Sequence, residues 1–437
     1  MRDIAFSSFF YPIPAVFLVM ASIKPFKAYR PTPELAPQVA SLPYDVMNSN
    51  EAREAAKGNP SSFLHVIRAE IDLPSSVEPH DSQVYETARD NLRSLIADGV
   101  LVQDDREQFY IYREVMNDRV QIGLVVCTEI DDYLNGVIKI HEFTRPDKEQ
   151  DRIQYTDVCD ANTGLIFLTY RSQENVKTLI ANWMKTHHPV YDFQSDDGIQ
   201  HTVWTIHEPD AIDTLINAFT AIDSLYVADG HHRTASAVKV GQMRREQHPD
   251  YCGDEPFNYF LSVLVPDEHL YIMDYNRVVK DLNGLTGQEF LRQVEKNFEV
   301  QDHPGPHKPR HPHTFGMYLS GAWHQLTAKP GTYNEHDPIG RLDVTILQNN
   351  LLAPILGIEN PKTDTRIDFV GGIRGLEELE KRVEQGMAVA FALYPTSIRD
   401  VMSVADAGKI MPPKSTWFEP KLRSGLFVHT LSGDGES

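Results

Sequence analysis

The sequence predicts a mixed α/β protein whose parts share one body. Short apolar patterns typical of strands alternate with amphipathic helical patterns along most of the 437 residues. Hydrophobic residues make up 41% and charged residues 24%, which is ordinary globular usage. No internal repeat, heptad run or long linker divides the chain, so we expect two lobes on one body rather than independent domains.

The first half contains a predicted hairpin. Residues 109–114 (FYIYRE) and 120–129 (VQIGLVVCTE) read as strands, and Asn117-Asp118 between them supplies turn chemistry. Glycines end two earlier helical patterns, at 49–57 and 82–97. The remaining predictions in this half are strands at 165–170 and 202–206 and a helix at 174–185.

The second half contains a predicted strand, tight turn and helix unit. A short apolar strand at 225–227 is followed by a helix at 233–247, after a helix at 211–222. Residues 302–313 (DHPGPHKPRHPH) have no periodicity and predict an exposed loop, whose prolines disfavour a metal site built from its histidines. The other predictions are strands at 259–265, 271–278, 366–370 and 389–393, and helices at 287–297, 342–356 and 375–384.

We expect four segments: an N-terminal extension at 1–22, an N-terminal lobe at 23–220, a core segment at 221–300, and a C-terminal lobe at 301–437. Residues 6–20 are apolar, but Pro12 and Pro14 interrupt them and they are too short for a spanning helix. They fit either a weak signal peptide or, as the favoured reading, an upstream start codon before Met20. No other run is apolar over the ~18 residues of a membrane span.

Net charge and cysteine content limit the class of binding partner and the cell compartment that we expect. The net charge of −21 opposes nucleic-acid binding through phosphate neutralisation, so a small-molecule partner is expected. The three cysteines are odd in number and widely spaced, which disfavours a disulfide framework and indicates a reducing cytoplasm. A homo-oligomer is compatible with the sequence and is not required by it.

The densest chemistry lies at 228–233 (ADGHHR), between the predicted strand and helix. Backbone N–H groups at a helix start favour an anion, and Gly230 allows close approach of a ligand. Arg233 offers a planar fork for phosphate or carboxylate, and His231 and His232 can donate hydrogen bonds or move protons. The structural alternative is that Asp229 caps the helix while the histidines pack as polar groups.

A second cluster lies at 141–152 (HEFTRPDKEQDR). Its cations, Arg145, Lys148 and Arg152, recur at helical spacing and could clamp an oxyanion. His141 and Glu142 are candidates for acid or base. A solvated charged helix explains the same residues equally well.

A third cluster approaches the phosphate-binding loop pattern at 408–415 (GKIMPPKS). Pro413 replaces the second glycine and has no N–H, so the standard phosphate nest cannot form there. Other geometries remain open for phosphate contacts from Lys414, Ser415, Thr416 and Lys421. The glycines at 370–375 do not fit the dinucleotide-binding spacing.

Taken together, several blocks resemble the domain of unknown function 1015 family over residues 23–431. The blocks are PYDV (43–46), NPSSFLHVIRAEID (59–72), HEFTRPDKEQDR (141–152), ADGHHR (228–233), LDVTILQNNLL (342–352), RIDFVGG (366–372) and MPPKSTWFEPKLRSGL (411–426).

Within these blocks, ADGHHR is similar to the signature loop of the ParB and sulfiredoxin superfamily and to the DGHHR of free serine kinases. This resemblance implies a ParB/sulfiredoxin-like core with large family-specific elaborations. It also implies phosphate contacts from Gly230, His231, His232 and Arg233, with Asp229 near the transferred group. The donor implied by the resemblance is a nucleotide or pyrophosphate.

The resulting hypothesis is a small-molecule phosphotransferase acting on the hydroxyl of free L-serine or a similar alcohol, with Mg²⁺ as cofactor. Glu142 or Asp229 would act as base, and Lys414 and Lys421 would hold the donor or the substrate carboxylate. The main alternative is a non-catalytic regulatory protein that binds a nucleotide or phosphate. A zinc hydrolase built on His141, His231 and His232 is disfavoured, because adjacent histidines in a turn rarely bind one ion.

Overall fold

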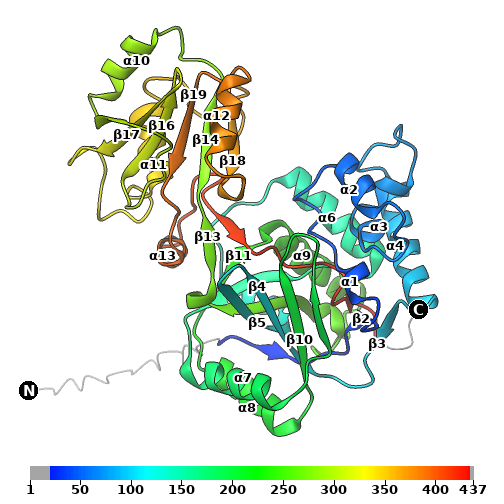
Figure 1. Cartoon of the computed structure of the whole chain (residues 1–437). Coiled ribbons are helices and arrows are strands. Elements are labelled where there is room, and N and C mark those ends of the chain that lie inside the picture. Colours follow the sequence, from blue (N-terminus) through cyan, green and yellow to red (C-terminus); the bar gives the residue numbers. More distant parts are fainter. Residues whose placement is uncertain (1–19, 434–437) are drawn as a thin grey trace, which may run out of the picture.

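A computed structural model describes residues 20–433 and has a mixed α/β fold, which confirms the predicted class. Figure 1 shows two lobes, each with its own sheet, joined by extended strands. The prediction for the N-terminal extension falls largely on residues 1–19, which lie outside the described residues. Within residues 20–433, none of the helices combines the length and apolar character that crossing a membrane requires.

The larger sheet forms the centre of the first lobe. Its strands lie in the order β6-β11-β8-β12-β5-β4-β10-β9, with β1 also paired to β5. The pairs β6–β11 and β8–β12 are parallel and the others are antiparallel. The bounds are β1 Ile23–Lys24, β4 Phe109–Met116, β5 Arg119–Glu129, β6 Ile138–Lys139, β8 Ile166–Tyr170, β9 Tyr191–Gln194, β10 Gln200–Ile206, β11 Leu225–Asp229 and β12 Tyr259–Pro266.

The predicted hairpin is confirmed by β4 and β5. Met116 pairs with Arg119, which leaves a two-residue turn in which Asn117 has a φ of 54°. Side chains alternate across the strands, so Tyr110 joins one hydrophobic core while Ile111 joins the other. Both faces of this sheet are therefore covered.

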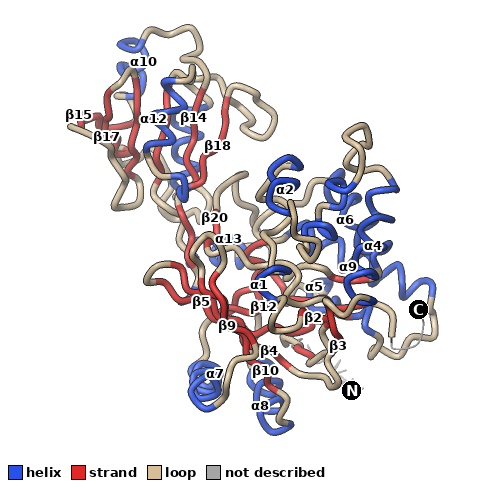
Figure 2. Tube along the Cα trace, turned by 45° about the vertical axis from the view of Figure 1, so that its right-hand side comes forward, coloured by secondary structure: helices blue, strands red, loops and turns tan. Residues whose placement is uncertain are grey.

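Helices pack against the larger sheet in two groups. α7 and α8 lie together below the sheet in Figure 1, where Trp183 and Phe219 pack into the core. Figure 2 shows α4, α6 and α9 grouped together, and Ala237 and Val238 of α9 join the same hydrophobic core as α7 and α8. The bounds in this lobe are α1 Ala36–Val39, α2 Ser49–Ala56, α3 Leu64–Ile67, α4 Ser82–Ala97, α5 Ile130–Leu134, α6 Pro146–Cys159, α7 Glu174–Thr186, α8 Pro209–Phe219 and α9 His231–Gln247, with 3-10 turns at Ala69–Asp72, Pro256–Asn258 and Asp267–His269.

A six-stranded sheet forms the second lobe, in the order β15-β17-β16-β19-β14-β18. The chain enters this lobe after β13 (Tyr271–Met273) and returns through β20 (Trp417–Glu419), which pairs with β13. The bounds are β14 Tyr275–Val279, β15 Phe298–His303, β16 Thr314–Leu319, β17 Ala322–Ala328, β18 Ile367–Gly371, β19 Val389–Leu393, α10 Gly287–Val294, α11 Asp343–Leu347, α12 Glu377–Glu384 and α13 Ile398–Asp406, with a 3-10 turn at Gly372–Arg374.

The C-terminal residues return to the first lobe. β21 (His429–Thr430) pairs with β7 (Ala161–Asn162), and a further two-stranded sheet joins β2 (Tyr29–Pro31) to β3 (Leu101–Gln103). The division of strands between the two large sheets falls between β12 and β14, within the expected core segment 221–300. The four-segment division itself stays a prediction.

One predicted helix is shorter than expected. The helix predicted over 342–356 is present as α11 followed by a π-helical turn, Gln348–Leu352. Pro354 follows two residues later, and proline lacks the N–H that would continue the helix. The cysteines agree with the sequence prediction, since Cys127, Cys159 and Cys252 are all free.

Candidate functional site

The strand, turn and helix unit predicted at ADGHHR is present as β11, Gly230 and α9. The helix begins at His231, two residues earlier than predicted. Gly230 has a φ of 92°, a left-handed conformation that glycine adopts readily. The register of β11 shifts between Val227 and Asp229, and such an irregularity next to a site re-aims side chains.

The start of α9 leaves backbone donors free of helical bonds. Thr234 N–H donates to Gly230 O at 2.9 Å, which is the first bond of this helix. The N–H groups of the three residues before Thr234 therefore have no acceptor within the helix. Together with the helix dipole, they favour an anion at this point.

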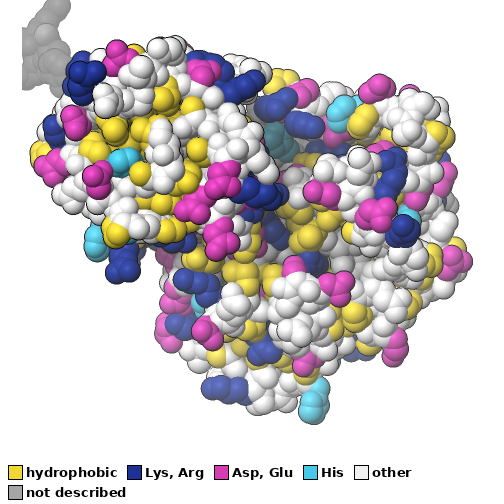
Figure 3. Space-filling view, turned by 45° about the horizontal axis from the view of Figure 1, so that its top comes forward, with side chains coloured by type: hydrophobic (Ala, Val, Ile, Leu, Met, Phe, Trp, Pro, Cys, Tyr) yellow, Lys and Arg dark blue, Asp and Glu magenta, His cyan; other side chains and the backbone are white. Residues whose placement is uncertain are grey.

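A cavity of about 280 Å³ lies beside the turn. It is lined by the turn itself and by the segment around Lys414, which returns from the second lobe. Figure 3 shows the surface hollowed between the two lobes, with Lys and Arg side chains gathered there. The lining residues are Tyr44, Asp45, Val46, Glu142, Ala228, Asp229, Gly230, His231, His232, Arg233, Tyr275, Lys414, Ser415, Thr416, Trp417, Phe418 and Lys421.

Asp229 is an ionised carboxylate in this cavity. Its Oδ1 accepts from Gly230 N–H at 2.8 Å, and its Oδ2 lies 3.1 Å from Lys421 Nζ. Burial alone would raise the pKa of Asp229, but Lys421 and Arg233 outweigh it and hold the pKa well below its usual range. Asp229 is therefore a poor proton acceptor near neutral pH.

The pKa of Glu142 is shifted in the opposite direction from that of Asp229. Burial raises the pKa of Glu142 above its usual value, Lys414 and Lys362 oppose this rise, and the charge of Asp229 adds to it. Two carboxylates of one cavity thus have pKa values pushed in opposite directions. That pattern separates a base from a permanently charged partner.

The histidines of the turn bond to the neighbouring main chain. His232 Nε2 accepts from Arg145 N–H at 3.1 Å, and His231 Nε2 lies 3.5 Å from His141 N. The rings of His141 and His231 meet edge to face with centroids 4.4 Å apart. Burial lowers the pKa of all three, that of His141 to about 4, so they are neutral at pH 7. In this geometry they hold residues 141–145 against the turn.

Arg233 also turns toward the main chain. Its Nη1 donates to Leu165 O, and its guanidinium packs against Gly230. A Cβ at residue 230 would lie 3.1 Å from Arg233 Nε and Nη2. Only a residue without a Cβ leaves room for this packing.

The 411–421 segment contributes the cations of the facing wall. Lys414 has a φ of 58° in a turn before β20, and its carbonyl accepts from Arg277 Nη2 at 2.8 Å. Ser415 Oγ donates to Pro412 O at 2.6 Å, while Thr416 lies between this turn and the strand. No helix follows Lys414, in agreement with the rejection of a standard phosphate-binding loop.

The cations predicted at 141–152 do not line the main cavity. Arg145 is the residue before α6, with its side chain 62% exposed and paired to Asp147 at 2.7 Å. Lys148 lies in the first turn of α6, and Arg152 lines a smaller cavity next to the main one. Their predicted roles in phosphate binding stay predictions.

Seven lining residues were not among the predicted site residues; Val46, Ala228 and Phe418 are apolar, and the other four carry polar side-chain groups. Tyr44 and Asp45 come from the PYDV block, and Tyr275 and Trp417 come from the strands that join the lobes. The two aromatic rings meet edge to face at 5.2 Å, and Lys421 Nζ lies 5.1 Å from the Trp417 ring. The PYDV block was already one of the family blocks, which is the signal that could have identified Tyr44 and Asp45.

Whether the site can bind a metal ion depends on its carboxylates. Among residues 20–433, no group of three or more His, Cys, Asp and Glu is arranged to hold a metal ion, which leaves the zinc alternative without support. Mg²⁺ usually needs only one or two carboxylates together with substrate phosphates. Glu142 and Asp229 in the same cavity fit that requirement.

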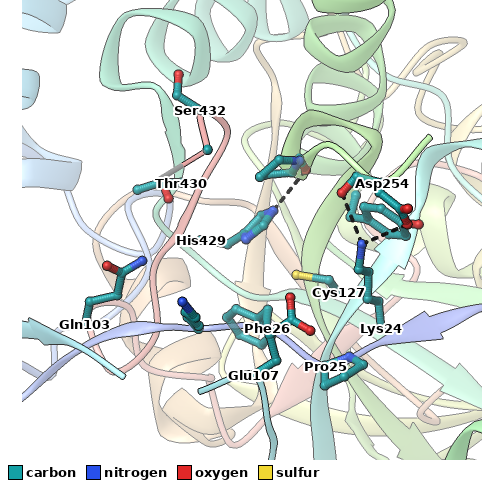
Figure 4. A pocket seen from close by; sticks show the side chains of 14 residues that line it. Lys24, Pro25, Phe26, Gln103, Glu107, Cys127, Asp254, His429, Thr430 and Ser432 are labelled. Carbon is teal, nitrogen blue, oxygen red and sulfur yellow. Dashed lines mark hydrogen bonds and ion pairs between the residues drawn. The ribbon is translucent and has the colours of Figure 1, made fainter. Parts of the chain in front are cut away.

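A separate cavity of about 170 Å³ lies by the N-terminal strand (Figure 4). Lys24 Nζ donates to Asp254 O at 3.1 Å, and His429 Nε2 donates to Pro256 O at 3.1 Å. Burial raises the pKa of the Cys127 thiol, so it is a weak nucleophile. Two lysines and two carboxylates line this cavity, so their charges offset one another and the cavity suits a polyanion less well.

Known proteins resemble this chain to different degrees. None of the curated protein sequences compared with it matches. A free serine kinase in complex with AMP matches with a TM-score of 0.36 and 12% identity over 70% of this chain and 91% of that chain. SbnI with C-terminal truncation from Staphylococcus aureus matches with a TM-score of 0.39 and 12% identity, over 70% and 87%. A conserved hypothetical protein from Pyrococcus furiosus gives 0.34 and 14%, over 70% and 95%.

These structural likenesses include the kind of protein that the ADGHHR loop resembles. The model of the family described as "protein of unknown function (DUF1015)" matches residues 23–345, and this chain belongs to that family.

Proposed function

We propose that this protein is a phosphotransferase that phosphorylates the hydroxyl of a small alcohol such as free L-serine, with a nucleotide or pyrophosphate as donor. One observation carries the proposal: a single cavity holds a helix start, two lysines and two carboxylates with opposite pKa shifts. Phosphoryl transfer requires charge neutralisation, alignment of the acceptor oxygen and a base for its proton. The cavity offers groups for each of these tasks.

The donor phosphates would bind at the start of α9. The N–H groups of His231, His232 and Arg233 supply hydrogen bonds without a helical competitor. Lys414 and Lys421 line the same cavity and supply positive charge. Because Lys421 is already paired with Asp229, the exposed Lys414 is the cation more readily available to the donor.

Glu142 is the proposed base. Its raised pKa brings a carboxylate closer to the pH at which it must accept a proton, which improves general-base catalysis. Asp229 remains charged and orients Lys421 and the turn. Bound Mg²⁺ would supply neutralisation of the donor phosphates, with Asp229 as the carboxylate available to hold it.

The histidines have a positioning role in this proposal. They hold the 141–145 loop, and with it Glu142, against the turn. The same bonds favour the second candidate, a regulatory protein that binds a nucleotide or phosphate without turnover, because they leave the rings without a proton-transfer task. The two candidates differ in what Glu142 does.

An assay on the purified protein tests the proposal. ATP, ADP and pyrophosphate are each combined with a panel of small hydroxy compounds in the presence of Mg²⁺, and phosphomonoester formation is followed by phosphorus NMR. A phosphotransferase forms product with at least one pair. Absence of product with every pair, together with retained donor binding, would establish the regulatory alternative instead.

A further inference from the structure

A second, smaller cavity adjoins the main one. It measures about 40 Å³ and shares Tyr44 and Arg233 with the lining of the main cavity. Its polar lining consists of guanidinium, hydroxyl and amide groups, and it includes no carboxylate. A cavity lined in this way favours an anion over a cation or a neutral group.

Arg152 is held rigidly at this cavity. Asp151 Oδ2 accepts from its Nε at 2.8 Å and pairs with its Nη2 at 2.7 Å. The guanidinium lies 4.4 Å from the Tyr44 ring and 4.5 Å from the Tyr155 ring, and its side chain is 13% exposed. Nη1 takes no part in the pair with Asp151, so it is the group that can meet a ligand.

Arg233 supplies the second guanidinium, between the two cavities. Nη1 is bonded to Leu165 O, whereas the buried Nε has no hydrogen-bond acceptor among the described residues. A buried donor without an acceptor is costly and is rare in folded proteins. An anion beside Arg233 would remove part of that cost.

The donors and the size of the small cavity limit which anion it can bind. Asp151 balances Arg152, and both Asp229 and Asp45 act on Lys421, so the free N–H donors of the guanidinium groups, and no surplus of charge, favour an anion here. One water needs about 10–15 Å³ of cavity volume. The small cavity therefore admits a group of about three heavy atoms, which is the size of a carboxylate and too small for a nucleotide.

We propose that this cavity binds the carboxylate of the acceptor, so that the acceptor is a small hydroxy acid or hydroxy amino acid. The inference rests on the proposed function and assigns the acceptor, whereas Lys414 and the start of α9 serve the donor. Thr163 and Ser424 line the same cavity and would complete the hydrogen bonds of the carboxylate. The hydroxyl would then extend into the main cavity, where Glu142 lies.

Binding to the wild-type protein tests this assignment without any substitution. Calorimetric titrations with serine and glycerate are compared with serinamide and ethanolamine, which keep a hydroxyl and lack the carboxylate. We expect serine and glycerate to bind at least tenfold more tightly than serinamide and ethanolamine. Equal binding of all four compounds would overturn the assignment.

Variants then locate the binding. Arg152→Met removes the guanidinium group, and Arg152→Lys keeps the positive charge while losing the planar geometry. Both should weaken serine binding at least fivefold, with Arg106→Met as the control because Arg106 is exposed and outside both cavities. Thr163→Val covers the case in which the Arg152 variants do not fold. Unchanged affinity in every variant that folds would overturn the assignment.

The failure of this inference is separable from failure of the proposed function. Carboxylate binding that depends on Arg152, without turnover with any donor, keeps the small cavity and removes the phosphotransferase. Turnover of ethanolamine at the rate of serine, unaffected by Arg152→Lys, keeps the phosphotransferase and removes the carboxylate cavity.

Discussion

Lys421 Nζ lies 3.1 Å from Asp229 Oδ2, across a separation of 192 residues in the sequence. The pair connects the turn before α9 to the segment that returns from the second lobe. The Lys421 side chain is 16% exposed and the Asp229 side chain 35%. This contact fixes a cation and a carboxylate at the centre of the proposed site.

Replacing Lys421 by Met should destabilise the protein and change its response to acid. The lowered pKa of Asp229 adds stability that is fully present above the unfolded pKa, about 3.9, and is lost as the pH falls through the folded pKa. Without Lys421 the pKa of Asp229 rises and this acid loss becomes smaller. Because the carboxylate is partly exposed, we expect a cost of only about 1 kcal/mol at pH 7.

Urea unfolding from pH 3 to pH 7 measures this effect, and pyrophosphate titration measures the anion affinity of each variant. Lys409→Met is a matched control, since Lys409 pairs with Asp337 at 2.8 Å away from the cavity. Equal anion affinity in the two variants would contradict the role given to Lys421.

Glu142→Gln should lower kcat by about 10²-fold or more and leave donor affinity unchanged, because the amide cannot accept the hydroxyl proton. In the wild type, kcat should fall as the pH drops through the pKa of Glu142, which is raised above its usual value. The pH profile of kcat and the donor Kd together check this. A variant that loses donor binding while keeping kcat would rule out Glu142 as base.

Gly230→Ala should weaken anion binding as well as stability. The left-handed φ of 92° costs an alanine about 1–2 kcal/mol, and the new Cβ would press on the Arg233 guanidinium at 3.1 Å. Gly58→Ala is the control, because its φ is 75° and no atom lies within 4 Å of the added Cβ. Thermal unfolding should show a loss in both variants, and pyrophosphate titration should show weaker binding in Gly230→Ala alone.

Glu114→Gln should stabilise the protein at alkaline pH. Burial raises the pKa of Glu114 to about 8, so the folded protein keeps a proton that the unfolded chain has already released above about pH 4.3. Stability from this group is therefore full at low pH and declines as the pH rises toward 8. The substitution removes that decline.

The comparison is made by urea unfolding at pH 5, 7 and 9. The gain of Glu114→Gln over wild type should increase with pH up to about 8 and then level off. Glu54→Gln is the control, since its side chain is 76% exposed. A gain that does not depend on pH would show that Glu114 is already ionised in the folded protein.

Local sequence patterns predicted much of the fold. The alternation in β4 and β5 and the Asn117 turn are properties of neighbouring residues, so they could be read directly. β16 was missed because Gly316 interrupts its strand pattern. The backbone of Gly316 approaches His307 so closely that a Cβ would lie 2.3 Å from His307 O, a tertiary contact that no local pattern reports.

The candidate site also has one part that could be predicted from the sequence and one part that could not. The turn at Gly230 and the start of α9 follow from residues adjacent in sequence. Tyr44 and Trp417 reach the cavity only through packing between distant segments. Arg145 was expected on a helical face with Arg152, but Pro146 begins α6 and leaves Arg145 outside it, with its side chain in solvent.

Binding of inorganic pyrophosphate tests most directly whether the cavity beside the Gly230 turn binds a polyanion. Calorimetry on the full chain compares the wild type, the double variant Lys414→Met with Lys421→Met, and Lys24→Met in the separate cavity of Figure 4. The account predicts that the double variant loses at least tenfold in affinity while Lys24→Met binds like the wild type. Unchanged affinity in the double variant, or loss in Lys24→Met alone, would contradict it.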